Sequence, residues 1–170
     1  FKDISGVAVP GSATTNHTNF EEAVLFTHRG LSGPAILQIS SYWTAGDPIS
    51  VNLLPNAADL LKTAKSKMPR SQIKAALAEH LPARLADVMA PRLGITRELA
   101  NVPDAELDRA AKILTHMEFH PTGTEGYAKA EVTAGGVDTA ALSSKTMEAK
   151  SVPGLFFIGE AVDVTGWLGG

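Results

Sequence analysis

The amino-acid sequence predicts an α+β fold in which β-rich segments surround a helical middle. Short runs rich in apolar and β-branched residues occupy residues 4–9, 20–27, 49–54, 117–122 and 127–133, and such runs are typical of strands. From residue 55 to residue 116 the apolar residues recur at three- and four-residue spacing, which is the period of a helix. We therefore expect a β-rich domain that is interrupted by a helical subdomain.

Composition limits the classes of protein to which the chain can belong. The 170 residues are 44% hydrophobic and 19% charged, enough to form a core, and the net charge is −3. Basic residues are dispersed, with one loose group at Lys62, Lys65, Lys67 and Arg70, which argues against nucleic acid as the main partner. The absence of cysteine excludes disulfides and Cys-based metal or redox sites. No apolar run approaches the roughly 20 residues of a membrane span, so we expect a cytoplasmic protein with no membrane partner.

The first two predicted strands, residues 4–9 and 20–27, have a pairing that the sequence leaves open. The dipeptide Pro10-Gly11 is a turn signal that ends the first strand. The polar stretch 12–19 that follows is too long for a tight hairpin, because the common hairpin loops have two to five residues. We therefore expect these strands to be joined by a long loop.

Five helices are predicted from apolar spacing and from residues suited to helix ends. Pro34 fits the first position of the first helix, because its missing N–H needs no partner there, and Ser71 is a plausible N-cap for the third. The predicted helices cover residues 34–43, 57–67, 72–80, a segment carrying Leu81 to Met89 that stops at Leu93-Gly94, and 104–116. After them, the strands at 117–122 and 127–133 could form a hairpin that closes a small sheet or barrel.

A short apolar run near the C-terminus points to a ligand site. Residues 155–158 follow a Pro-Gly turn and read as a strand buried on both faces. The run ends at Gly159-Glu160, and in open α/β sheets ligands bind just outside the carboxyl ends of strands. A glycine there lets a ligand approach the backbone, and the adjacent acid can accept hydrogen bonds from sugar-like hydroxyls. The alternative is an ordinary turn with an exposed acid.

Several motifs, taken in order, resemble one known family. Residues 133–137 read Thr-Ala-Gly-Gly-Val, 146–150 read Thr-Met-Glu-Ala-Lys, 154–160 read Gly-Leu-Phe-Phe-Ile-Gly-Glu, and 163–170 read Asp-Val-Thr-Gly-Trp-Leu-Gly-Gly. Together with Phe-Thr-His-Arg-Gly-Leu-Ser-Gly-Pro at 26–34, they closely resemble the bacterial HI0933-like (YhiN/BaiN-type) FAD-dependent oxidoreductases. The resemblance runs from about residue 4 to residue 170 and is strongest at the two ends.

The resemblance implies a flavoprotein oxidoreductase with FAD as cofactor, a small-molecule substrate, and NAD(P)H or molecular oxygen as redox partner. Such proteins open with a strand–GxGxxG–helix, which these 170 residues do not contain. The chain is therefore interpreted as an internal fragment, inactive alone, that covers the flavin and shapes the substrate pocket. The expected division is a barrel-like insertion domain at 1–54 and 117–133, a helical subdomain at 55–116, and a C-terminal strand segment of the FAD-binding domain at 134–170.

The same resemblance suggests which residues form the site. Small residues beside a flat ring and an acid on the ribityl chain imply cofactor contacts at Thr133, Gly135, Gly136, Gly159, Glu160, Gly169 and Gly170. His28 and Ser32, between a strand and a helix N-terminus, are candidates for catalysis, and the equally weighted alternative is a capped turn with a surface histidine. No metal site is expected, because His116 and His120 stand in or beside a predicted strand and not on one helix face.

A non-enzymatic alternative is also open, in which the helical subdomain, or helical lobe, at 55–116 is a module that docks a protein partner. That hypothesis predicts a contiguous exposed apolar patch on the helices. The enzyme hypothesis predicts exposed apolar surface along residues 4–9 and 155–158, where the rest of a FAD-binding domain would pack.

Overall fold

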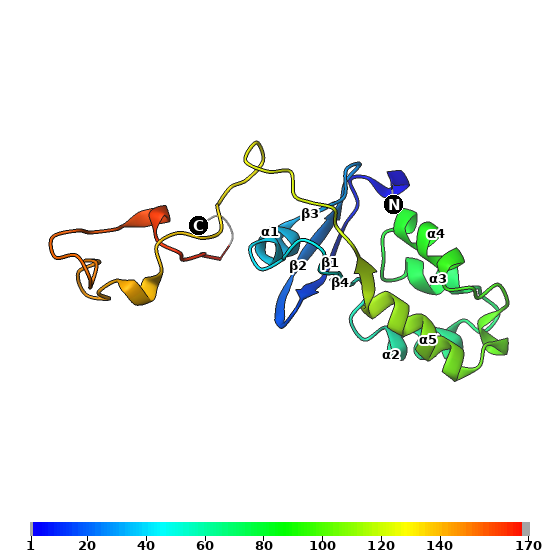
Figure 1. The fold of residues 1–170 in the computed structure, drawn as a ribbon. Helices are drawn as coiled ribbons and strands as arrows, with labels where there is room; N and C mark the ends of the chain where they lie inside the picture. The colour runs from blue at the N-terminus through cyan, green and yellow to red at the C-terminus, as the bar shows by residue number, and fades with distance from the viewer. Residues whose placement is uncertain (1, 168–170) are drawn as a thin grey trace. The chain divides into compact units, whose positions relative to one another are not determined.

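The computed structural model describes residues 2–167 of the chain (Figure 1). It forms two compact units, an N-terminal unit of residues 1–122 and a C-terminal unit of residues 123–170. The predicted α+β class is confirmed, since the N-terminal unit combines a curled antiparallel sheet with helices. None of the helices in the described residues is both long enough and apolar enough to cross a bilayer.

A five-stranded antiparallel sheet forms the frame of the N-terminal unit. Its strands are β1 (Ala8–Thr15), β2 (Thr18–Phe26), β3 (Leu31–Ser32), β4 (Ile49–Asn52) and β5 (Met117–Phe119), in the spatial order β3-β2-β1-β4-β5. Side chains alternate between the two faces of a strand, and the buried set includes Val9, Val24 and Val51. The opposite face of β1 and β4 carries polar residues.

The prediction of a long loop between the first two strands was wrong. β1 continues through Pro10-Gly11, which pair with Ala23 and Glu22, and the connection is a two-residue turn between Thr15 and Thr18. Asn16 in this turn has a φ of 50°, a left-handed conformation that asparagine tolerates and tight hairpins require. Residues 2–4 form a 3₁₀ turn and not the start of a strand.

Helix α1 (Pro34–Ser40) begins at Pro34 as predicted but ends three residues early. It packs Ala35 and Ile39 into the core against β2. The indole N–H of Trp43 donates to the carbonyl oxygen of Asp47 at 2.8 Å. Trp43 therefore stabilises the turn that leads to β4 and does not extend the helix.

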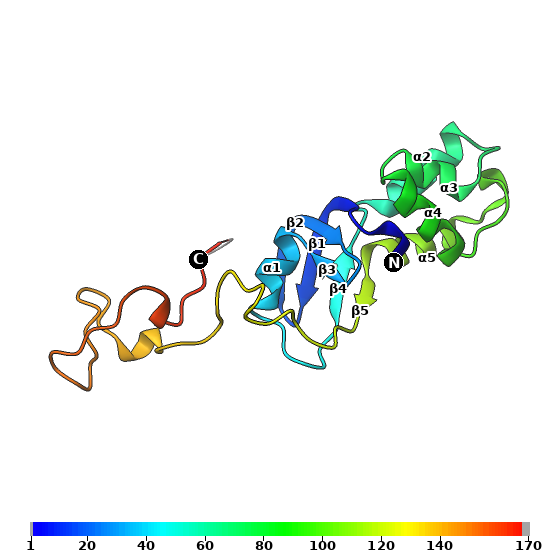
Figure 2. The ribbon, with the colours of Figure 1, turned by 90° about the horizontal axis from the view of Figure 1, so that it is seen from above.

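Four helices are inserted between β4 and β5, and Figure 2 shows them gathered at one end of the sheet. They are α2 (Ala57–Lys67), α3 (Ile73–Ala78), α4 (Ala83–Arg92) and α5 (Asp104–Thr115). Large side chains from all four are fully buried, among them Leu61, Leu77, Leu85 and Leu107. Helices α2 and α5 are also joined by two ion pairs, Lys62–Asp108 and Lys65–Asp104, both at 2.7 Å.

The predicted cap of the third helix is wrong. Gln72, not Ser71, occupies the N-cap of α3, and no side chain caps it. Ser71 instead uses its carbonyl oxygen to accept a hydrogen bond from the N–H of Leu99 at 2.9 Å. This bond joins the turn before α3 to the segment around Leu99.

The predicted hairpin of 117–122 with 127–133 does not form. β5 ends at Phe119 and pairs with β4, and no strand follows within residues 120–133. Tyr127, the largest side chain of the second run, is 89% exposed. The β-forming residues there have no neighbouring face against which to bury, so propensity alone does not produce a strand.

The C-terminal unit has a small core and only single-residue bridges between its segments. Leu142, Ala149 and Val162 form the core, and the bridges join Val137 with Val162, Leu142 with Ala149, and Glu148 with Phe156. The prediction of a doubly buried strand at 155–158 was wrong, since Phe156 is 55% and Ile158 74% exposed. Burial on both faces needs two covering layers, and this unit provides none within its described residues.

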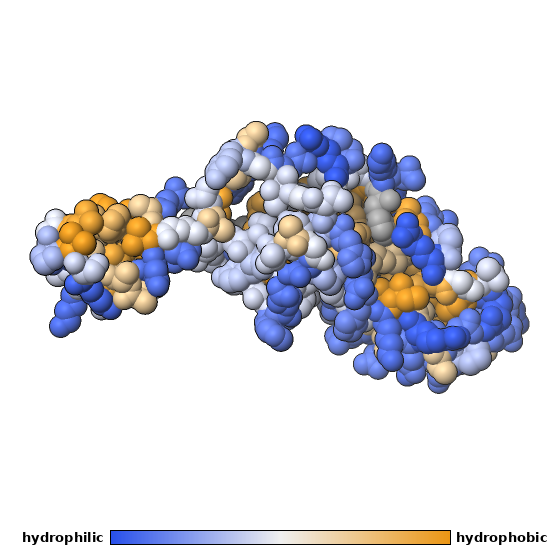
Figure 3. Space-filling model, viewed as in Figure 1, coloured by the Kyte–Doolittle hydropathy of each residue, from blue (hydrophilic) through white to orange (hydrophobic). Residues whose placement is uncertain are grey.

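The enzyme hypothesis predicted exposed apolar surface along residues 4–9 and along residues 155–158, and it is present only along the second. Leu155, Phe156, Ile158 and Val164 are exposed, and Figure 3 shows apolar surface on the C-terminal unit. Along residues 4–9 the prediction was wrong, because Ile4, Val7 and Val9 are buried in the main core.

Gly11 provides a test of how closely β1 and β4 approach each other. A Cβ placed on Gly11 would overlap the carbonyl oxygen of Asn52. We expect Gly11→Ala to lower the free energy of unfolding by about 1–3 kcal/mol, because the strand backbones must separate. Urea unfolding measures the difference.

Gly123→Ala is the control, because a Cβ added there would meet no atom within 4 Å and no positive φ strains its backbone. If Gly11→Ala and Gly123→Ala unfold with equal free energies, the close approach of the two strands is not present.

Candidate functional site

His28, the first predicted catalytic residue, lies at an exposed position in a tight turn. The hydroxyl oxygen of Thr27 accepts hydrogen bonds from the N–H groups of Arg29 and Gly30, at 3.2 and 3.0 Å. Ser32 is half-buried in β3, opposite Leu25. No hydrogen bond joins His28 to Ser32 in the described chain, so their catalytic role stays a prediction.

The structure brings two of the predicted cofactor segments together. The N–H of Val137 donates to the carbonyl of Ala161 at 2.8 Å, and the N–H of Asp163 donates to the carbonyl of Val137 at 2.9 Å. These bonds place Gly135-Gly136 beside the segment that begins at Gly159-Glu160. Gly136 is required by this contact, because a Cβ there would lie 2.8 Å from the carbonyl oxygen of Ala161.

The other predicted cofactor-binding residues lie in open surroundings or outside the described part of the chain. Gly135 and Gly159 have positive φ values of 90° and 70°, and a Cβ added to either would meet no atom within 4 Å. Thr133 and Glu160 are exposed. Gly169 and Gly170 lie outside the described residues. The described site is therefore an open backbone surface beside one acid.

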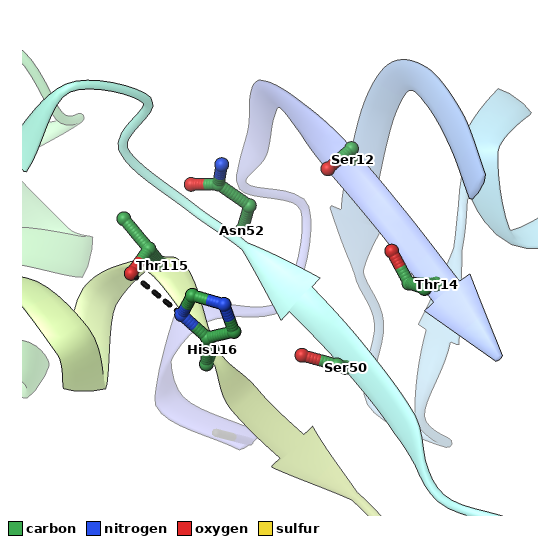
Figure 4. A pocket seen from close by; sticks show the side chains of 6 residues that line it. All are labelled: Ser12, Thr14, Ser50, Asn52, Thr115 and His116. Carbon is green, nitrogen blue, oxygen red and sulfur yellow. Dashed lines mark hydrogen bonds between the residues drawn. The ribbon is translucent and has the colours of Figure 1, made fainter. Parts of the chain in front are cut away.

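A polar hollow on the N-terminal unit was not predicted. It has a volume of about 320 Å³ and is lined by Ser12, Thr14, Ser50, Asn52, Thr115 and His116 (Figure 4). No Lys, Arg, Asp or Glu lines it, so its hydrogen-bonding groups are hydroxyls, an amide and an imidazole. We call it the polar hollow.

Strand register explains how the polar hollow forms. Ser12 and Thr14 of β1 are paired with Asn52 and Ser50 of β4. Val51 is paired with Met117 of β5, so the preceding residue, His116, lies level with Asn52. Residues two apart share a face, and the intervening Val51 faces the core.

Hydrogen bonds fix the side chains at one edge of the polar hollow. The hydroxyl of Thr115 lies 2.9 Å from the carbonyl oxygen of Ala111 and 3.4 Å from that of Lys112, and either carbonyl can accept its proton. We predict that the hydroxyl donates to a carbonyl and that Nδ1–H of His116 donates in the 2.8 Å contact with the same hydroxyl oxygen. In the neutral imidazole, Nε2 is left as an acceptor.

Asn52 is oriented in the same way by its neighbour in the chain. Its side-chain oxygen accepts from the N–H of Leu54 at 3.1 Å, so its NH₂ group is available to donate. Thr14 donates to the side-chain oxygen of Asn19 at 2.8 Å and keeps its lone pairs as acceptors. The polar hollow thus offers donors and acceptors at defined positions.

In the sequence, His116 stands out only through its spacing from His120, a pair for which no metal site was expected. No group of three or more His, Asp or Glu side chains with metal-binding geometry occurs among the described residues. The available signal for the hollow was the alternation of polar side chains at 12 and 14 and at 50 and 52. That pattern is also typical of any strand face that meets water.

Eight of the ten basic residues of the helical lobe, residues 55–116, fall into two groups. The hydrogen bond with Asp108 raises the pKa of Lys62, and the hydrogen bond from Lys65 lowers the pKa of Asp104. Lys74 is paired with Asp87, and Arg97 with Glu106. A second group makes no ion pair within the described residues: Lys67, Arg70, Arg109 and Lys112.

Comparison with known proteins identifies the class to which this fold belongs. A family model described as "HI0933-like protein barrel and H2TH domain" matches residues 1–132, which is the sheet with its inserted helices and the segment that follows. The chain therefore belongs to the HI0933-like family, and the resemblance seen in its motifs is confirmed.

Two curated relatives carry the same name. The chain is 51% identical over 178 aligned residues to ribosomal RNA dihydrouridine synthase of Escherichia coli (strain K12), covering 98% of this chain and 43% of that protein. It is 44% identical over 172 residues to ribosomal RNA dihydrouridine synthase of Haemophilus influenzae, again covering 98% of this chain and 43% of that protein. The chain thus spans less than half the length of these relatives.

The orientation of His116 is testable without any ligand. We expect neutral His116 to carry its proton on Nδ1, the minority form of free histidine, because the Thr115 hydroxyl accepts from that nitrogen. In Thr115→Val this acceptor is lost and the proton should move largely to Nε2. Two-bond ¹H–¹⁵N NMR spectra distinguish the two tautomers.

Exposed His80 serves as the internal reference in the same spectra, because Thr115→Val should leave its signals unchanged. A wild-type His116 with its proton on Nε2 would contradict the assigned hydrogen-bond direction.

Proposed function

We propose that this chain forms the barrel, helical lobe and a flavin-contacting segment of a FAD-dependent enzyme that reduces uridines of ribosomal RNA to dihydrouridine. The observation that carries the proposal is the 51% identity, over 98% of the chain, to a ribosomal RNA dihydrouridine synthase. Identity at this level over nearly the whole chain supports a shared fold and a shared reaction. Such an enzyme would work in the cytoplasm, which is also the location expected from the sequence.

The product named for the relatives defines the chemistry that is needed. Dihydrouridine is uridine with its C5=C6 double bond reduced, so two electrons and two protons must be added. Amino-acid side chains do not supply a hydride, and a bound flavin does. NAD(P)H is the proposed source of the electrons, and molecular oxygen is then a competing acceptor.

The C-terminal unit offers residues that suit part of an FAD molecule. Gly135 and Gly159 present open backbone, to which a planar ring or a ribityl chain could come close without meeting a side chain. Glu160 is exposed beside Gly159 and could accept a hydrogen bond from a ribityl hydroxyl. Thr133 and Gly136 would complete this surface, and a pyrophosphate cradle of the GxGxxG type is not among these 170 residues.

Charge distribution supports RNA as the partner of the helical lobe. Residues 55–116 contain ten of the fifteen Lys and Arg residues and seven of the eighteen Asp and Glu residues, a net charge of +3. The rest of the chain carries five basic and eleven acidic residues, a net charge of −6. A basic lobe on an acidic protein is suited to contact with phosphates. This proposal departs from the expectation of no nucleic-acid partner, and the experiment below decides between them.

The alternative of a protein-docking module finds little support on the helices. Among the described residues of α2 to α5, Ile113 is the one exposed large apolar side chain, at 39% exposed. A single exposed isoleucine is normal for a soluble surface. The enzyme proposal is therefore preferred.

The proposed function predicts the dihydrouridine content of ribosomal RNA. A strain in which the gene for the full-length protein is deleted should lose dihydrouridine from its ribosomal RNA, and the plasmid-borne gene should restore it. Mass spectrometry of nucleosides from purified ribosomal RNA measures the change, and dihydrouridine in transfer RNA is the internal control. An unchanged level in ribosomal RNA would contradict the proposed function.

Glu160 provides a test of the cofactor surface in the full-length protein. We expect Glu160→Ala to weaken FAD binding roughly tenfold to hundredfold, because one hydrogen bond to a charged group contributes about 1.5–3 kcal/mol. Titration of the apoprotein with FAD, followed by flavin fluorescence, gives the dissociation constants.

Glu131→Ala removes another exposed acid of the same unit and should leave FAD affinity at the wild-type value. Equal affinities for wild type and Glu160→Ala would show that Glu160 does not contact the cofactor.

A further inference from the structure

The polar hollow presents its hydrogen-bonding groups in an ordered pattern. Asn52 and Ser50 lie two residues apart on β4, so they share a face about 7 Å apart along the strand. His116 comes from the neighbouring chain segment, level with Asn52, and Figure 4 shows its ring beside β4 on the side away from β1. An amide, an imidazole and a hydroxyl therefore lie close together in the hollow.

Each of these three groups has a defined role as hydrogen-bond donor or acceptor. The NH₂ group of Asn52 donates, because its oxygen is engaged by Leu54. Nε2 of neutral His116 accepts in the predicted tautomer, in which Nδ1–H donates to the Thr115 hydroxyl. The hydroxyl of Ser50 has no hydrogen-bond partner within the described residues and is available to donate. Together the three groups offer two donors and one acceptor.

A cyclic imide is the complement of that array. Uracil presents O4, N3–H and O2 along its pairing edge, which is acceptor, donor, acceptor. Cytosine presents an amino donor and an unprotonated N3 and does not match. The lining without charged groups suits a neutral ring, and proteins read single-stranded RNA mainly through such exposed pairing edges.

We propose that the polar hollow binds the uracil ring of an unpaired uridine in the RNA substrate. Nε2 of His116 accepts the N3 proton, and Asn52 and Ser50 donate to the two carbonyl oxygens. Ser12 and Thr14, on the adjacent strand β1, form the opposite wall of the hollow. The inference rests on the proposed function and adds the residues that select uridine over cytidine.

The test uses the full-length FAD-loaded protein and two RNA oligonucleotides. One contains uridine at a single unpaired position, and the other has N3-methyluridine there, which lacks the N3 proton. Wild-type protein should bind the uridine oligonucleotide roughly tenfold to hundredfold more tightly, because the methyl group leaves the acceptor of His116 unpaired. Equal binding of the two would overturn the proposal.

Two variants assign the discrimination to the hollow. His116→Phe keeps a ring but removes the acceptor, so the two oligonucleotides should bind it equally. Asn52→Asp keeps the oxygen that engages Leu54 and replaces the donor by an acceptor, so uridine binding should fall at least tenfold. His80→Phe, at an exposed histidine outside the hollow, should retain wild-type discrimination. Retained discrimination in His116→Phe or unchanged uridine binding by Asn52→Asp would overturn the proposal.

The flavin ring also contains a cyclic imide, and the same variants separate the two ligands. If the hollow binds uracil, both variants should retain wild-type FAD content and visible absorbance. If they lose FAD while still discriminating between the oligonucleotides, the hollow belongs to the cofactor and the uracil proposal is wrong. Failure of the uracil proposal would not contradict the proposed function, because the oligonucleotide assay measures binding without turnover. The dihydrouridine content of ribosomal RNA tests the proposed function separately.

Discussion

The antiparallel pairing of β4 with β5 is the constraint on which the N-terminal unit depends. Val51 and Met117 are direct partners, and the helical lobe is the chain between them. The N–H of Leu53 donates to the carbonyl of Leu114 at 2.9 Å, so the contact continues beyond the sheet to the last turn of α5. Closing so long a loop costs chain entropy, and the buried leucines of the four helices offset that cost. The insertion and the sheet therefore stabilise each other.

The same register produces the polar hollow. With Val51 facing the core, Ser50 and Asn52 must face outward, and His116, the residue before β5, is level with Asn52. A slip of one residue would bury Ser50 and Asn52 and expose Val51, which the apolar core opposes. The energy that holds the hydrogen-bonding array in place thus comes from the buried face of the strands. Four of the six residues that line the polar hollow therefore stand on strands whose register the core fixes.

Elements that depend on interactions between residues close in the chain could be predicted from the sequence. Elements that depend on contacts between distant residues could not. Helix α2 has the predicted bounds, Ala57–Lys67, because its apolar spacing is local and long. The β1–β2 turn was missed because Pro10-Gly11 reads as a break, whereas paired strands on both sides hold it extended. Tyr127 lies in a run with strand propensity but without a face to bury it. The polar hollow combines residues about 100 positions apart in the chain, so no local pattern could place His116 beside Asn52.

The most direct test of this account is a cross-strand disulfide that measures the β4–β5 register. These 170 residues contain no cysteine, so within them an introduced pair reacts without competition. Ser50 and Glu118 are direct partners, and Cα atoms of such partners lie about 4.5–5.5 Å apart, within disulfide range. The account predicts rapid disulfide formation in Ser50→Cys/Glu118→Cys and little in Ser50→Cys/Phe119→Cys, as measured by free-thiol titration under mild oxidation. Faster closure of the second pair would mean that β5 is shifted by one residue and that His116 does not lie beside Asn52.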